Sequence, residues 1–185
     1  MTKPIITIDI VSDIVCPWCY IGKRRLEKAI DAVRDQYDFT LEYHPFELNP
    51  GVPETGVNQQ EYLTRKFGST ERYQQITSHV TGVAAQEGLS FHFEKQTTSP
   101  NTRKAHSLVQ LALEEGKQLT VVEAFFKAYF TDGIDLSREE NLLAVAVQAG
   151  LDKSKATEHL HHDQGLLQVA LAEKEMSSLG ISGVP

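Results

Sequence analysis

The order of apolar and polar residues predicts a βαβ unit over the first 50 residues. Residues 5–12 are almost continuously apolar, which is typical of a strand buried on both faces. Apolar residues then recur at helical spacing over 17–36. Phe39, Leu41 and Tyr43 alternate with polar residues, as in a second strand. Because a helix connects the two strands, we expect them to pair in parallel.

From about residue 58 to residue 180 the spacing of apolar residues is helical. The run from Ala105 to Leu113 has apolar residues at the spacing of one helix face, and residues 142–149 are apolar nearly all round. Glycines in the gaps between such segments predict helix ends at Gly116, Gly133, Gly150 and Gly165. We therefore predict an all-helical region after the βαβ unit.

Composition narrows the class of protein. With 185 residues, 41% of them hydrophobic, the chain suits one domain, or a core domain with a large insertion. The net charge of −7 argues against nucleic acid or an anionic membrane as a partner. No apolar stretch reaches the roughly 18 residues that span a bilayer, and residues 1–4 lead into the first strand without a signal segment. We expect a cytoplasmic protein. The sequence does not indicate whether the protein is a monomer or an oligomer.

The chain has two cysteines, Cys16 and Cys19, at the junction of the first strand and the first helix. A disulfide between them would close a very small ring, whereas a structural disulfide normally closes a long loop. Cysteines at this spacing beside a strand-to-helix turn suit redox exchange. In a reducing cytosol we expect the pair to be mostly dithiol.

The residues around the cysteines predict different roles for them. Pro17 fits the first helical position, which leaves Cys16 at the N-cap. There a thiolate would be stabilised by the free N–H groups of the first turn and by the helix dipole. We therefore predict that Cys16 is the nucleophile and that Cys19 is less exposed and resolves the mixed disulfide. The basic residues 23–25 either lower both thiol pKa values or form a solvated helix face.

Two other interpretations of the cysteines remain. A structural zinc site needs about four ligands, and the only candidates to join Cys16 and Cys19 are the histidines of the segment 159–162. We expect those histidines to be solvated and predict no metal site. The other alternative is a pair of inert buried thiols.

Six segments carry a family resemblance: Asp13–Gly22, Pro45–Pro50, Asn101–Thr102, Ala105–His106, Ala128–Phe130 and Leu179–Pro185. On these segments, which span nearly the whole chain, the sequence resembles the DsbA-like thioredoxin superfamily and, within it, the FrnE-type thiol–disulfide oxidoreductases. That branch neighbours the 2-hydroxychromene-2-carboxylate isomerases and the kappa-class glutathione transferases. The resemblance implies an α/β fold, a thioredoxin-like core with a large all-helical insertion.

The resemblance also implies how the chain is divided. Residues 1–57 form the βαβ half of the core, residues 58–180 the helical insertion, and residues 181–185 the return to the core. Pro185 would follow a cis peptide bond and pack against the cysteine pair, and the backbone of Val184 would pair with substrate. In this family a β-hairpin and a helix follow that proline. We therefore expect the C-terminal part of the core to be missing and the chain to be a truncated form of a longer protein.

Four other residues are candidates for the site, each with an alternative role. Asp13 either helps to deprotonate Cys19 through a water molecule or caps the strand end. Trp18 either offers an exposed docking surface or folds onto the helical insertion. Asn101 and His106 either border the substrate groove or serve as a plain helix N-cap and a satisfied interior histidine, respectively.

We predict a thiol–disulfide oxidoreductase that acts on protein or small-molecule thiols and disulfides. It would need no cofactor besides its own cysteine pair, with glutathione as a candidate co-substrate. The alternatives are a glutathione-dependent isomerase or transferase and a non-catalytic client-binding module. In the isomerase and transferase relatives the first cysteine is typically a serine, so two retained cysteines favour dithiol chemistry. The central Pro17-Trp18 replaces the Pro-His of DsbA, which predicts a less oxidising pair.

Overall fold

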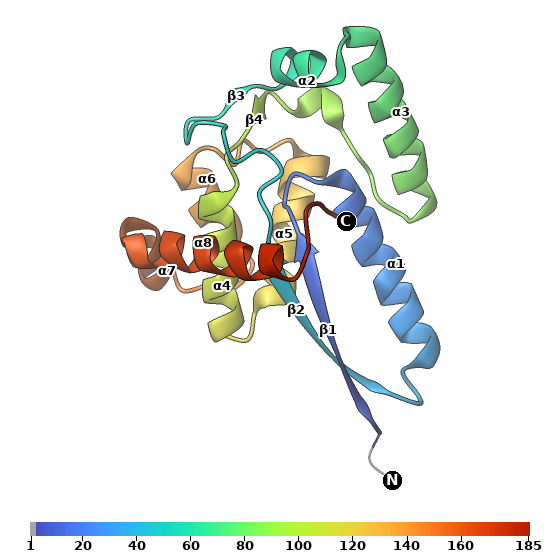
Figure 1. Ribbon diagram of the computed structural model, residues 1–185, viewed down its shortest axis with the longest axis vertical. Coiled ribbons are helices and arrows are strands. Elements are labelled where there is room, and N and C mark those ends of the chain that lie inside the picture. The colour runs from blue at the N-terminus through green and yellow to red at the C-terminus, as the bar shows by residue number, and fades with distance from the viewer. Residues whose placement is uncertain (1–2) are drawn as a thin grey trace.

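The computed structural model of the protein describes residues 3–185, and its first part is the predicted βαβ unit (Figure 1). Strand β1 (Ile5–Ser12), helix α1 (Pro17–Val33) and strand β2 (Asp38–Pro45) follow one another, and the strands pair in parallel. The register places Ile5 opposite Asp38 and Ser12 opposite Pro45. The two strands are confirmed, while α1 ends at Val33, short of the predicted boundary at residue 36.

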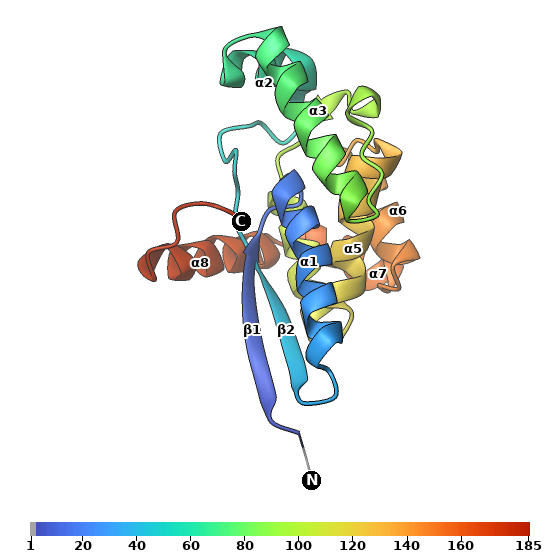
Figure 2. The same ribbon diagram turned by 90° about the vertical axis from the view of Figure 1, so that its right-hand side faces the viewer.

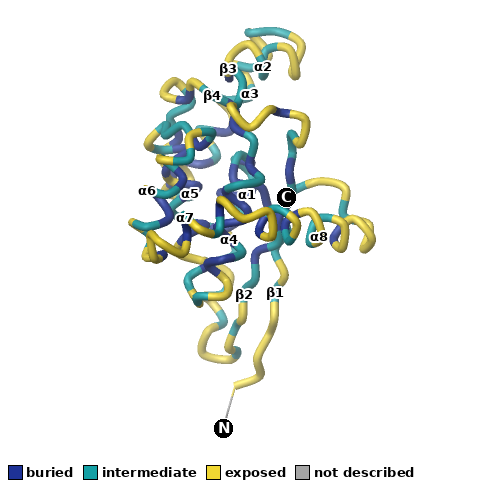
Figure 3. Tube along the Cα trace, turned by 90° about the vertical axis from the view of Figure 1, so that its left-hand side faces the viewer, coloured by how far each residue is buried: buried dark blue, intermediate teal, exposed yellow. Residues whose placement is uncertain are grey.

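Strand β1 is less buried than predicted. Ile5 is 71% exposed, and exposure falls along the strand until Ser12, which is buried. Within residues 3–185 the only strand that pairs with β1 is β2. Helix α1 runs alongside the two strands (Figure 2), but the N-terminal residues of β1 remain exposed (Figure 3). The prediction of burial on both faces is therefore wrong for the N-terminal half of β1.

The rest of the described chain is mainly helical, as predicted. Its elements are β3 (Val57–Asn58), α2 (Gln59–Phe67), α3 (Thr70–Gln86), η1 (Phe93–Lys95), β4 (Thr98–Ser99), α4 (Arg103–Glu114), α5 (Gln118–Lys127), η2 (Ala128–Asp132), α6 (Glu139–Gln148), α7 (Lys153–His161) and α8 (Asp163–Ser178). The antiparallel pair β3–β4 was not predicted, because two-residue strands are too short to show a period. None of the described helices combines the length and apolar character needed to cross a membrane. The division at residues 57 and 180 stays a prediction.

The helical part packs against the βαβ unit on two sides. Helices α4, α5 and α8 contact β2, and α3 contacts α1. Aromatic rings connect the start of α1 to this helical part: the ring of Tyr20 stacks on Phe126 with 4.9 Å between centroids, and Phe91 stacks on Phe130 at 4.7 Å. Large buried aromatic rings dominate core energetics, so this cluster holds the first turns of α1 in place.

Gly165 does not end a helix, contrary to the prediction, but lies in the first turn of α8. A Cβ atom at this position would meet the Ser107 hydroxyl and would lie 2.6 Å from Nε2 of His159. The glycine therefore allows α8 to approach α4 and α7 closely. The other three predicted helix ends have the positive φ that favours glycine after a helix: Gly116, Gly133 and Gly150.

Gly165→Ala is expected to lower the free energy of unfolding by about 1–3 kcal/mol, because the added methyl group has no space between the helices. Gly82→Ala is the matched control. Gly82 lies within α3 and is exposed, and a methyl group added to it would have no atom of another element within 4 Å. Alanine should therefore stabilise this helix by about 0.5–1 kcal/mol. Urea denaturation measures both changes, and shifts of the same sign would contradict the close-packing explanation.

Candidate active site

The two cysteines lie at the N-terminal end of α1, as predicted. Cys16 is the N-cap residue, with φ −90° and ψ 109°, and Pro17 opens the helix. The Cys16 amide donates to the carbonyl of Asp13 at 3.0 Å, and the Cys16 carbonyl accepts from the amide of Cys19 at 3.1 Å. A turn and the first helical turn therefore fix the backbone on both sides of Cys16.

Both thiols are buried, which the sequence did not indicate. Cys16 is 3% exposed and Cys19 is 7% exposed, so the prediction that Cys19 is the less exposed of the two is wrong. The Cys16 side chain also makes no capping hydrogen bond with the first turn of α1. Both cysteines belong to the apolar core that continues into the helical part, and this tertiary packing decides their exposure.

The two buried thiols lie close together, so the titration of each depends on the state of the other. The thiol of Cys16 donates to the sulfur of Cys19, which lowers the pKa of Cys19; burial opposes this, and the backbone of Asp13 and the hydroxyl of Ser12 support it. The same hydrogen bond, together with burial, raises the pKa of Cys16. The prediction that Cys16 is the nucleophile and holds the stabilised thiolate stays a prediction.

The basic residues 23–25 are paired with carboxylates, not with the thiols. Lys23 lies 2.7 Å from Oε2 of Glu123, and Arg24 and Arg25 pair with Glu123 and Glu87, respectively. Burial raises the pKa of Glu123, but the hydrogen bonds from Arg24, Lys23 and Tyr20 outweigh it and lower that pKa to about 2. Lys23 is buried in this ion-pair network. The group is therefore neither a source of positive charge for the thiols alone nor simply a solvated helix face.

Asp13 and His106 form a buried pair behind the cysteines. They are 93 residues apart in the chain, and His106 Nε2 lies 3.2 Å from Asp13 Oδ1 and 3.2 Å from the carbonyl of Phe46. The other Asp13 oxygen accepts from the amide of Leu48 at 2.7 Å. Burial lowers the pKa of His106, but Asp13 outweighs burial and raises it. The pair fixes the segment 45–50, and the general-base role of Asp13 stays a prediction.

Asn101 connects a loop to the start of α4 and is not its N-cap, which is Thr102. The Asn101 amide donates to the carbonyl of Val52 at 2.9 Å, and its side-chain oxygen accepts from the amide of Arg103 at 3.0 Å. Arg103 in turn donates twice to Oε1 of Glu47, at 2.8 and 2.7 Å. Asn101 and its neighbour thus fix the loop after β2; contact of Asn101 or His106 with a substrate stays a prediction.

Trp18 and the last two residues lie close to the start of α1. The Trp18 ring is partly buried and lies 6.0 Å from the ring of His79 on α3, which matches the alternative that it folds onto the helical part. The peptide bond between Val184 and Pro185 is cis, as the resemblance implies. Val184 packs against the core, and the end of the chain lies beside the N-terminal end of α1 (Figures 1 and 2).

An apolar cavity of about 130 Å³ opens beside the cysteine motif. The two residues that flank Cys16, Val15 and Pro17, line it together with apolar side chains of α2 and α3. Polar side chains also line the cavity: Oε1 of Gln59 accepts from the hydroxyl of Ser99 at 3.0 Å and from the hydroxyl of Tyr129 at 2.7 Å. This cavity was not predicted from the sequence. The helical spacing of Tyr73, Ile76 and Val80, which line it from α3, does indicate that these side chains share one face of a helix.

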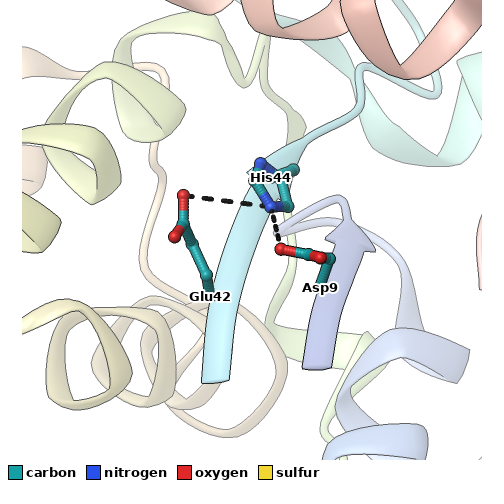
Figure 4. A group of neighbouring side chains, drawn as sticks. All are labelled: Asp9, Glu42 and His44. Atoms are coloured by element: carbon teal, nitrogen blue, oxygen red, sulfur yellow. Dashed lines mark hydrogen bonds and ion pairs between the residues drawn. The ribbon is translucent and has the colours of Figure 1, made fainter. Parts of the chain in front are cut away.

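One group of side chains in residues 3–185 has the composition of a metal site (Figure 4). Asp9, Glu42 and His44 share a face of the β1–β2 pair, and His44 Nε2 lies 2.9 Å from Asp9 and 3.9 Å from Glu42. The hydrogen bond between His44 and Asp9 accounts for this partly exposed group without an ion, and we assign no metal to it. Neither the cysteines nor the histidines of segment 159–162 belong to a group of three or more candidate ligands in the described chain.

Comparison with known proteins gives consistent matches. The family model for the DSBA-like thioredoxin domain matches residues 7–185. The crystal structure of a probable DsbA oxidoreductase from Streptomyces coelicolor is 34% identical, with a TM-score of 0.88 over 97% of this chain and 78% of that chain. The cytosolic disulfide reductase DsbM from Pseudomonas aeruginosa, also solved with GSH, is 18% identical over 97% of this chain and 82% of its own, with a TM-score of 0.66. That likeness shows the fold alone.

A curated relative matches over a shorter length. The uncharacterized protein YwbO from Bacillus subtilis is 28% identical over 145 residues. The match covers 78% of this chain and 66% of that protein, so the chain spans just under two thirds of this relative's length.

Proposed function

Since the chain belongs to the DsbA-like thioredoxin domain family, we propose that it is a thiol–disulfide oxidoreductase that works through Cys16 and Cys19. One observation carries the proposal: the two cysteines of the chain lie together at the N-terminal end of α1, where the carbonyl of Cys16 accepts from the amide of Cys19 at 3.1 Å. A dithiol in this position can form and break a disulfide without changing the rest of the fold. The reaction needs no cofactor besides the pair itself.

In the first step, Cys16 gives up its proton to water. The Cys16 thiolate attacks one sulfur of a substrate disulfide, the substrate S–S bond breaks, and one substrate thiolate leaves and takes a proton from water. Cys16 suits this role because it lies at the positive end of the helix dipole and between two residues that line the cavity. The product is a mixed disulfide between Cys16 and substrate.

In the second step, Cys19 gives up its proton to water, and its thiolate attacks the sulfur of Cys16. The Cys16–Cys19 bond forms, the bond from Cys16 to substrate breaks, and the second substrate thiol leaves. Two electrons pass to the substrate, and two molecules of a thiol such as glutathione return the pair to the dithiol form while they become a disulfide. The net direction depends on the redox poise around the protein, and the cytoplasmic location stays a prediction.

The cavity beside Pro17 is the proposed place for the non-reacting part of the substrate. Its apolar walls suit an apolar group next to the reacting sulfur, and Lys66 lines it with a side chain that donates to Asn49 at 2.6 Å. A cation there suits the carboxylate of a peptide-like thiol. Glutathione fits this description as the thiol donor, and a solved structure of DsbM holds GSH.

A redox titration tests the function. The full chain is equilibrated with mixtures of reduced and oxidised glutathione, and the fraction of free Cys16 and Cys19 is read by thiol alkylation and intact mass. We expect a reversible disulfide with a potential more negative than the value of about −120 mV of DsbA, because Trp18 supplies no cation beside the thiols. A pair that forms no reversible disulfide would overturn the proposed function; a potential at or above that value would overturn the role of Trp18.

A further inference from the structure

Two buried ionisable side chains face each other behind the cysteine pair. Asp13, in the turn after β1, is 0% exposed, and His106, on α4, is 3% exposed. Both oxygens of Asp13 accept hydrogen bonds, from Leu48 and from His106, as an ionised carboxylate does. Nε2 of His106 lies 3.2 Å from Asp13 and 3.2 Å from the carbonyl of Phe46. Since both neighbours of Nε2 are acceptors, this nitrogen carries a proton.

The burial of Asp13 favours a positive charge on His106. A fully buried carboxylate is costly unless a cation pairs with it. Among residues 3–185, His106 is the only basic side chain at ion-pair distance from the Asp13 carboxylate. Arg103, which opens α4, pairs with Glu47 instead, at 2.7 Å. The geometry therefore indicates a buried pair of a carboxylate and an imidazolium.

The same turn contains Asp13 and Cys16. The amide of Cys16 donates to the carbonyl of Asp13 at 3.0 Å, and the Cα atoms at the two ends of such a turn lie within about 7 Å of each other. Two charges this close in a buried environment interact appreciably. The neighbouring Cys19 and burial are the main causes that raise the pKa of Cys16, and the charge of Asp13 adds to them. Asp13 without a cation would therefore disfavour a thiolate on Cys16.

We propose that His106 is a positioning residue whose positive charge, held beside Asp13, offsets the negative charge of Asp13 and so favours the thiolate of Cys16. The proposal rests on the proposed function, in which that thiolate attacks the substrate disulfide. His106 acts through Asp13, and it needs no contact with a substrate. Because the two charges cancel, the pair adds no net positive charge behind the thiols, and the expectation of a potential more negative than that of DsbA is unchanged.

Other charged and titratable groups surround His106. They are His44 on β2, Glu47 after β2, Arg103 on α4 itself, His159 on α7 and Glu173 on α8. His44 pairs with Asp9, and Arg103 pairs with Glu47. Glu173 accepts from the amide of Glu47 at 2.6 Å, and its pKa is raised, first by burial and then by the charge of Glu47. The test therefore includes a Glu173 variant.

The test measures the ionisation of Cys16 in a chain with one thiol, Cys19→Ser, with and without His106→Gln. Glutamine keeps a donor for Asp13 but carries no charge. The rate of alkylation by iodoacetamide, read by intact mass, follows the thiolate fraction. Below the Cys16 pKa of the parent chain, His106→Gln should lower this rate about tenfold. At high pH, where Cys16 is ionised in both chains, the rates should converge, whereas poorer access to the sulfur would lower the rate at every pH.

Two variants in the same background serve as controls. His159 is a half-buried histidine whose Nε2 lies 3.1 Å from the carbonyl of Ser107 and not beside a carboxylate. His159→Gln should therefore leave the alkylation profile unchanged. Glu173→Gln should leave the effect of His106→Gln in place, because Asp13 is the charge that His106 offsets.

Asp13→Asn gives the opposite readout. Removal of the negative charge should raise the alkylation rate below the Cys16 pKa, and His106→Gln added to Asp13→Asn should have little further effect. Wild-type protein gives a measurement that needs no variant, which keeps the test decisive if His106→Gln folds poorly. Nitrogen-15 NMR of the imidazole should show protons on both ring nitrogens of His106 at neutral pH.

Three results would overturn the role of His106. They are a neutral His106 ring in the wild type at neutral pH, an unchanged alkylation profile in His106→Gln, and a loss of rate that is equal at every pH. A wild-type cysteine pair that forms no reversible disulfide with glutathione would instead overturn the proposed function. Alkylation of Cys16 requires no disulfide, so the two failures are distinguishable.

Discussion

Cys16→Ser is expected to abolish disulfide exchange, and Cys19→Ser to stop it after the first step. A serine hydroxyl is almost fully protonated near neutral pH and does not attack a disulfide as a thiolate does. Without Cys19, the bond between Cys16 and substrate has no internal thiolate to break it, so a mixed disulfide should accumulate. Insulin precipitation with a glutathione donor measures the exchange, and intact mass detects the trapped adduct.

The control for this experiment is a measurement that each variant is folded. Serine is close in size to cysteine, although Cys16 is buried and a hydroxyl is more polar than a thiol, so the denaturation midpoint of each variant should be recorded with its activity. Full activity of a folded Cys16→Ser variant would end the proposed mechanism. Activity that persists in Cys19→Ser would favour a glutathione-dependent isomerase or transferase, and client binding that ignores both cysteines would favour a binding module.

Leu108→Ala is expected to lower the free energy of unfolding by about 2–5 kcal/mol. Leu108 lies in α4, is 0% exposed and belongs to the apolar core that includes both cysteines. The substitution removes apolar contacts and leaves a cavity that close-packed neighbours fill only in part. Urea denaturation followed by circular dichroism measures the loss.

Leu171→Ala makes the same chemical change at a position where burial is small. Leu171 lies in α8 and is 66% exposed, so its truncation should change the free energy of unfolding by less than about 0.5 kcal/mol. The difference between the two variants then reports burial, since the atoms removed are the same. Equal losses in both would mean that the core does not include α4 as described.

The parts of the fold that the sequence predicted follow from short-range patterns. The apolar run that ends at Ser12 and the alternation from Phe39 place the two strands correctly, because a period of two shows within a few residues. The cap position of Cys16 and the place of Pro17 were likewise predictable, since proline restricts the first helical turn. Gly165 shows the limit: the same residue type ends one helix and allows close approach in another, and only the neighbouring helices distinguish the two uses.

Burial was the property that local patterns predicted worst. The run from Ile5 has the composition of a central strand, but its exposure depends on what lies against it. The exposure of Cys16 and Cys19 likewise depends on an apolar core built largely from helices far along the chain. The Asp13–His106 pair, 93 residues apart, has no signature in either local segment.

The sequence by itself determined which atoms can react. Cys16 and Cys19 are the only thiols, their spacing limits them to a small ring, and their place between a strand and a helix suits exchange. Only the tertiary structure decided how deeply the two sulfurs are buried and which groups surround them. A thiol pKa depends on burial and on the donors that surround the sulfur, and for Cys19 these include the end of β1 as well as α1. Spacing along the chain specifies the pair of thiols, whereas the packing of distant elements sets their electrostatics.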